Sequence, residues 1–190
     1  MKKDIILAGV GGQGILTIAT VIGQAAISSN MNLKQAETHG MSQRGGDVQS
    51  HLRISTDKIH SDLIPMGGAD LILSVEPMEA LRYLPYLSEN GWLITNSTPF
   101  VNIPNYPDKE EIYKKIKAVK NHVIIDADQI AKDLGSPRSM NIVILGAAVK
   151  TLGLTLQQIE EAIKTIFGRK GDAIVEDNIK ALRAGFEAAK

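Results

Sequence analysis

A glycine-rich segment, Gly9-Val10-Gly11-Gly12-Gln13-Gly14, lies near the start of the chain and most limits the folds open to it. The apolar run 4–8 before it predicts a buried strand, and the apolar positions of 15–28 after it recur at helical spacing. Glycine lets the backbone approach a ligand closely, and a helix start points free N–H groups at the loop. The segment therefore favours binding of phosphate, pyrophosphate or carboxylate, although a tight turn that serves packing alone remains an alternative.

The rest of the chain alternates between strand and helix patterns. Further strands are predicted over 33–38, 69–75, 92–95 and 123–125, and 48–55 alternates in the manner of a half-exposed strand. Helices are predicted from Pro77 and over 126–134, 140–152, 155–166 and 174–186, with Asp126 as a cap and Thr155 with Gln158 as a capping box. We therefore expect a single domain over 1–190. Its predicted fold is α/β, with a Rossmann-like, doubly wound, mostly parallel sheet and a helical C-terminal tail.

Composition excludes several functions. The 21 basic and 21 acidic side chains cancel, which argues against a general nucleic-acid or membrane-surface binder. No apolar stretch approaches the ~20 residues that span a bilayer. With no cysteine, the chain cannot supply a thiolate nucleophile or ligate an iron–sulfur cluster, and this is consistent with a cytoplasmic setting. The four histidines lack metal-ligand spacing, so we expect no metal site.

A second polar, glycine-containing segment, 38–47, follows the second predicted strand. Loops at the carboxyl ends of parallel strands face a common crevice, so this loop is expected to converge with the glycine loop. Arg44 would then offer a guanidinium group to a phosphate or carboxylate. An interface anchor is an equally good interpretation of this arginine.

A stand-alone nucleotide-binding enzyme is the main alternative function. Glu37 stands near the place where a dinucleotide-binding fold carries its ribose-binding acid. NAD is disfavoured because the chain continues from Glu37 into the second loop and a strand, where such a fold would have a helix. ATP, bound as in adenylating enzymes that share the G-x-G-G-x-G pattern, and a small binding module for an anionic ligand also stay open.

Five segments together resemble one known family: 9–14, 37–46, 50–55, 70–74 and 141–146. They are similar to the gamma-type module of the 2-oxoacid:ferredoxin oxidoreductases, in particular to the small (beta) subunits of the indolepyruvate type. The resemblance covers most of the chain, and the 37–46 loop is far more specific than the glycine motif.

The resemblance implies a reaction and a set of partners. Such complexes oxidatively decarboxylate a 2-oxoacid, here indolepyruvate or another arylpyruvate, join the acyl group to coenzyme A and reduce ferredoxin. They use thiamine diphosphate with Mg²⁺ and [4Fe–4S] clusters. This chain has no cysteine, and Gly171-Asp172-Ala173 is not the Gly-Asp-Gly thiamine signature. These cofactors are therefore expected on a larger alpha subunit, through which ferredoxin is reached.

For this chain the resemblance implies a supporting role beside the coenzyme A side of the active site. We expect no catalytic residue on it, no activity when it is alone, and self-association when it is isolated. Because coenzyme A carries phosphates, the two loops are its expected contacts. The candidate residues are Gly9, Gly11, Gly12, Gln13, Gly14, Thr38, His39, Ser42, Gln43, Arg44, Gly45 and Gly46.

Overall fold

The computed structural model describes residues 1–40 and 45–189, and its strands form one mixed sheet. Within the described residues the sheet has six strands in the order β2-β3-β1-β4-β5-β6. Strands β1, β4, β5 and β6 are parallel neighbours, whereas β3 runs antiparallel to both β1 and β2. The bounds are β1 Lys2–Val10, β2 Asn32–His39, β3 Asp47–Ser55, β4 Ala69–Ser74, β5 Leu87–Asn96 and β6 His122–Ile125.

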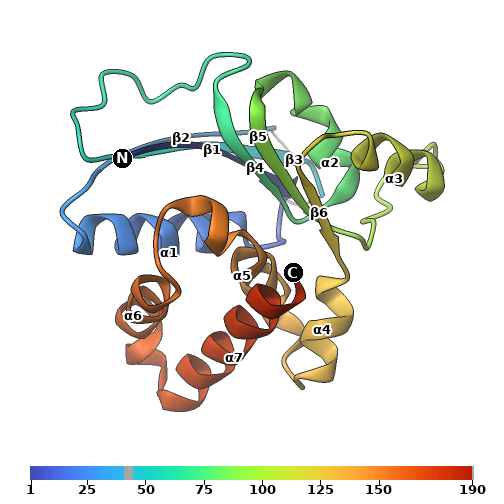
Figure 1. Ribbon diagram of the computed structural model, residues 1–190. Coiled ribbons are helices and arrows are strands. Elements are labelled where there is room, and N and C mark those ends of the chain that lie inside the picture. Colours follow the sequence, from blue (N-terminus) through green and yellow to red (C-terminus); the bar gives the residue numbers. More distant parts are fainter. Residues whose placement is uncertain (41–44, 190) are drawn as a thin grey trace.

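Helices cover both faces of this sheet (Figure 1). Ile5 and Leu7 of β1 belong to a large apolar cluster with α1, α4, α5, α6 and α7, and Ile6 and Ala8 point to the opposite face, against α2 and α3. This alternation explains why the first strand is apolar at consecutive positions. The helices are α1 Ile15–Ser28, α2 Pro77–Arg82, α3 Lys109–Lys117, α4 Ala127–Asp133, α5 Met140–Leu152, α6 Leu156–Phe167 and α7 Asp172–Ala188.

The α/β prediction is confirmed, with most of its boundaries. Helices α1 and α5 begin and end at the predicted residues, and the Thr155–Gln158 capping box is present. Asp126 caps α4 by accepting from the N–H of Gln129 at 2.9 Å. Strand β5 begins five residues before the predicted 92, at Leu87.

The prediction that 48–55 is half exposed is wrong. His51 and Ser55, on the face expected to be polar and solvated, are each only 4% exposed. The connection between β3 and β4 covers that face, and the N–H of Ile64 donates to His51 Nδ1 at 2.9 Å. A polar strand can thus be buried on both sides when loops and neighbouring side chains satisfy its polar groups.

In the part of the chain that the structure describes, no helix is both long enough and apolar enough to cross a membrane.

Candidate functional site

The glycine loop connects β1 to α1 at the carboxyl edge of the sheet. Gly9 is required by packing, because a Cβ there would lie 2.4 Å from Val75 Cγ2. Gly14 has a φ of 83° and forms the N-cap of α1, a left-handed conformation that disfavours other residues. A Cβ on Gly14 would also lie 2.4 Å from Asn141 Nδ2. The loop is therefore shaped partly by its own backbone and partly by helix α5.

Hydrogen bonds within the loop fix which of its groups are free. Gln13 folds back, because its Oε1 accepts from the N–H of Val10 at 2.8 Å and its own N–H donates to Val10 O at 3.1 Å. Asn141 Nδ2 donates to Gly14 O at 3.1 Å. Among the described residues, no acceptor meets the N–H groups at the loop and helix start, namely those of Gly12, Gly14, Ile15 and Leu16.

The second loop converges with the glycine loop, as the sequence predicted. The N–H of Gly11 donates to Gly46 O at 2.8 Å, and the N–H of Gly45 donates to Gly11 O at 3.3 Å. Thr38 and His39 end β2 and pair across the sheet with Gln49 and Val48. The predictions for Ser42, Gln43 and Arg44 fall outside the described residues.

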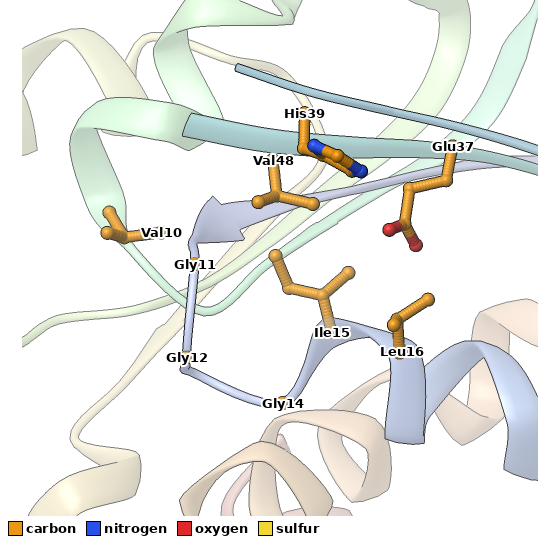
Figure 2. Close-up of a pocket in the computed structure, with 9 residues that line it drawn as sticks. All are labelled: Val10, Gly11, Gly12, Gly14, Ile15, Leu16, Glu37, His39 and Val48. Atoms are coloured by element: carbon orange, nitrogen blue, oxygen red, sulfur yellow. The ribbon is translucent and has the colours of Figure 1, made fainter. Parts of the chain in front are cut away.

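A cavity of about 420 Å³ lies between the glycine loop, the start of α1 and the end of β2 (Figure 2). Its apolar lining comes from Val10, Ile15, Leu16 and Val48, and its polar side chains are those of Glu37 and His39. Leu16 is 55% exposed although it is a large apolar residue. The cavity is of the size that small-molecule sites occupy, which are commonly about 300–1,000 Å³.

Glu37 lines this cavity, although from the sequence it was considered only as a possible ribose-binding acid. It and His39 are two positions apart in β2, so both point to the same face of the sheet (Figure 2). Glu37 Oε2 is buried and has no hydrogen-bond partner among the described residues. The period of two in β2 and the position of Glu37 at the strand end were the signals that could have singled it out.

A buried carboxylate holds the neighbouring part of the carboxyl edge. Glu76 follows β4 and is 0% exposed. It accepts from the N–H of Glu79 at 2.8 Å, from the N–H of Phe100 at 3.2 Å and from the Tyr106 hydroxyl. Burial, together with this hydrogen bond and the charge of Glu76, raises the pKa of Tyr106 above its usual range. With both oxygens occupied, Glu76 acts as a structural anchor for the loop after β5.

That loop in turn contacts the second glycine-containing loop. Asn102 Nδ2 donates to Gly45 O at 2.6 Å. Its apolar neighbours Phe100, Val101 and Ile103 are 43%, 69% and 37% exposed. Three chain segments thus meet beside the cavity.

Within the described residues, no group of three His, Asp or Glu side chains is arranged to hold a metal ion.

Comparison with known proteins gives a consistent set of relatives. The family model described as pyruvate ferredoxin/flavodoxin oxidoreductase matches residues 4–188. The indolepyruvate oxidoreductase subunit IorB of Archaeoglobus fulgidus is 37% identical, with 100% of this chain and 96% of the relative covered. The IorB subunit of Methanothermobacter thermautotrophicus is 38% identical, with 100% and 98% covered.

Solved structures share the fold. The gamma subunit of a keto/oxoacid ferredoxin oxidoreductase from Geobacter sulfurreducens superposes with a TM-score of 0.74 at 26% identity, with 98% of each chain covered. A 2-oxoglutarate:ferredoxin oxidoreductase from Magnetococcus marinus, with 2-oxoglutarate, coenzyme A and succinyl-CoA bound, gives a TM-score of 0.78 at 21% identity. The match covers 99% of this chain but 31% of that longer polypeptide, so the fold there is one part of a larger protein.

Proposed function

This chain belongs to the pyruvate ferredoxin/flavodoxin oxidoreductase family, and from that membership we propose that it is the small subunit of an indolepyruvate-type 2-oxoacid:ferredoxin oxidoreductase. The observation that carries the proposal is 36–38% identity to four IorB subunits over the whole of this chain. The complex oxidatively decarboxylates an arylpyruvate to the acyl-CoA and passes the electrons to ferredoxin.

The redox cofactors belong on a larger alpha subunit in this proposal. An iron–sulfur cluster does not fit this chain, because it has no cysteine to ligate one. Thiamine diphosphate bound through Mg²⁺ fits poorly too, since the chain lacks the Gly-Asp-Gly signature and the described residues offer no group of three His, Asp or Glu side chains that could hold a metal ion. The small subunit therefore completes a site whose thiamine diphosphate, Mg²⁺ and [4Fe–4S] clusters are held by its partner.

Coenzyme A is the group that the two converging loops of this chain fit. The free N–H groups at the start of α1 suit an anion, and the cavity beside them suits a small molecule. We assign the contact to the members of the predicted set that line the cavity, namely Gly11, Gly12, Gly14 and His39. Gly9 and Gln13 shape the loop, and Gly45 and Gly46 hydrogen-bond Gly11 beside it. Thr38 lies one position before His39 in β2 and so points to the other face of the sheet.

None of the comparisons supports the stand-alone nucleotide-binding alternative. The strand order also differs from a dinucleotide-binding unit, because β2 pairs with the antiparallel β3 and no helix stands between them in the described residues. Equilibrium titration of the isolated chain with NAD and ATP tests this alternative. The proposal predicts no tight binding of either nucleotide without the partner subunit.

Reconstitution tests the proposed function. The purified chain is assayed alone and after co-expression with a large subunit of the family, with indolepyruvate, coenzyme A and a viologen dye as acceptor. We expect turnover only for the assembled pair, and faster turnover with arylpyruvates than with pyruvate or 2-oxoglutarate. Turnover by the chain alone, or a failure of the pair to assemble, would contradict the proposal.

The isolated chain exposes an apolar surface that a partner would cover. Phe100, Val101 and Ile103 are exposed neighbours of Asn102, which contacts the second loop, and Leu16 is exposed at the start of α1. Without a partner such side chains favour association of like copies. We expect the isolated chain to self-associate in size-exclusion chromatography, and the Val101→Asp variant to do so less.

A further inference from the structure

We propose that Glu37 is a specificity-determining residue, which accepts a hydrogen bond from a hydroxyl or amino group of the ligand bound in the cavity. The N–H groups at the start of α1 take an anionic group of the same ligand. The ligand class is thus a phosphorylated nucleoside, and within the proposed function, on which this inference rests, it is the nucleotide end of coenzyme A.

The carboxylate of Glu37 lies at one end of the cavity. Its Oε2 is buried, and it has no hydrogen-bond partner among the described residues. A buried acceptor that has lost water and gained no donor destabilises the folded chain. Figure 2 shows the side chain reaching from β2 toward Leu16, into the space that the cavity occupies. A donor that enters the cavity would satisfy this oxygen.

The opposite end of the cavity, at the glycine loop, carries hydrogen-bond donors instead of an acceptor. Gly12, Gly14 and the first residues of α1 present N–H groups without an acceptor among the described residues. The partial positive charge of a helix N-terminus adds to their preference for an anion. The cavity therefore has a donor end at the glycine loop and an acceptor end at Glu37.

This polarity selects the ligand. A second anion beside Glu37 would be repelled by the carboxylate, so the cavity does not fit a ligand that is anionic at both ends. Between the two ends, Ile15, Leu16 and Val48 form an apolar wall suited to a flat or hydrocarbon portion. The nucleotide end of coenzyme A combines these features, because its phosphates are attached to the ribose and the amino group of its adenine, a hydrogen-bond donor, lies at the other end.

The first test removes the charge of Glu37 at constant shape. We would measure the dissociation constant of coenzyme A for the assembled complex by isothermal titration calorimetry, with wild-type chain and with Glu37→Gln. A hydrogen bond to a charged acceptor corresponds to roughly a tenfold change or more in affinity, so we expect about tenfold weaker binding. We expect kcat at saturating coenzyme A to stay unchanged, since Glu37 contributes binding and no chemistry.

Two controls separate this effect from misfolding. Glu89→Gln makes the same chemical change at an exposed position near the start of β5, and should leave the affinity unchanged. Urea unfolding of the isolated Glu37→Gln chain should show no loss of stability, because Glu37 Oε2 makes no hydrogen bond among the described residues that the substitution would remove. A residue with a purely structural role would lower the stability of the fold when it is substituted. Weaker binding of coenzyme A at unchanged stability therefore indicates that Glu37 contacts the ligand.

Fragments of coenzyme A test the ligand assignment. Adenosine 3′,5′-bisphosphate should compete with coenzyme A in the wild-type complex and compete about tenfold less well with Glu37→Gln. Pantetheine, which lacks the phosphates, should be insensitive to the substitution. The reverse pattern would overturn the assignment to the nucleotide end.

The remaining outcomes are also decisive. Unchanged or tighter binding of coenzyme A by Glu37→Gln would overturn the proposal, the latter because it would place an anion beside Glu37. Weaker assembly of the two subunits with unchanged ligand affinity would show that a basic side chain of the partner is the donor, and would also overturn it. If the wild-type chain fails to assemble with a large subunit, the proposed function itself fails.

Discussion

Substitution of Gly14 by alanine tests how the glycine loop is built. A left-handed alanine costs roughly 1–2 kcal/mol. The new Cβ would also meet Asn141 Nδ2 at 2.4 Å and displace the hydrogen bond from this amide to Gly14 O. Loss of that bond adds about 0.5–1.5 kcal/mol, so Gly14→Ala should lower the free energy of unfolding by about 1.5–3.5 kcal/mol.

Gly12→Ala is the matched control. Gly12 also has a positive φ, 103°, but a Cβ there would meet nothing within 4 Å. It should therefore carry only the backbone strain, about 1–2 kcal/mol. Urea unfolding followed by circular dichroism measures both variants, and Gly14→Ala in an Asn141→Ala background should cost no more than Gly12→Ala does. Equal destabilisation by the two single substitutions would refute the packing of Asn141 on the loop.

Substitutions at three further places test other parts of the structure. Burial lowers the pKa of His51, and its neutral ring accepts a hydrogen bond from the N–H of Ile64. The neutral ring therefore stabilises the folded chain fully above pH 6.5, the usual pKa of histidine. This stabilisation is lost as the pH falls through the lowered pKa. Urea unfolding between pH 7.5 and 5 should show this loss, and a profile no flatter for His51→Phe would contradict it. Glu76→Ala removes a helix cap and two further hydrogen bonds and should destabilise the chain by roughly 3–5 kcal/mol, against about 1.5–3 kcal/mol for Tyr106→Phe. Equal losses for these two variants in urea would exclude the anchoring role. Gly185→Ala would place a Cβ 1.9 Å from a backbone oxygen of α5. It should lower the free energy of unfolding by about 1–3 kcal/mol or more. An unchanged thermal midpoint would rule out the close crossing of α7 on α5.

Local patterns were enough to predict the elements with strong periodicity or capping signals. Helix α5 is apolar on nearly every face and buried, and it begins and ends at its predicted residues. The Thr155–Gln158 capping box and the Asp126 cap are local hydrogen-bonding devices, so they can be read from a few neighbouring residues. The convergence of the two glycine-containing loops followed from their common edge of the sheet.

Features that depend on distant segments could not be predicted. The burial of His51 is produced by residues after β3 and by the ring of Tyr86, whose centroid lies 5.2 Å away. The role of Glu76 depends on Phe100 and Tyr106, more than twenty positions further along the chain. Gln13 was predicted as a ligand contact from its place in the motif, but its side-chain oxygen accepts a hydrogen bond from the N–H of Val10. The period of two in β2 could have indicated which face Glu37 occupies, but the cavity and the missing partner of its Oε2 depend on distant segments.

If this chain completes an enzyme whose cofactors lie on a partner, activity depends on the ratio of the two subunits, and a titration measures that dependence. Increasing amounts of the chain are added to a fixed amount of cofactor-loaded large subunit, and arylpyruvate-dependent reduction of ferredoxin is followed. We expect no activity from either subunit alone, and a rate that rises until the two are present in a fixed stoichiometric ratio. Full activity of the large subunit without this chain, or any activity of this chain without the large subunit, would contradict it.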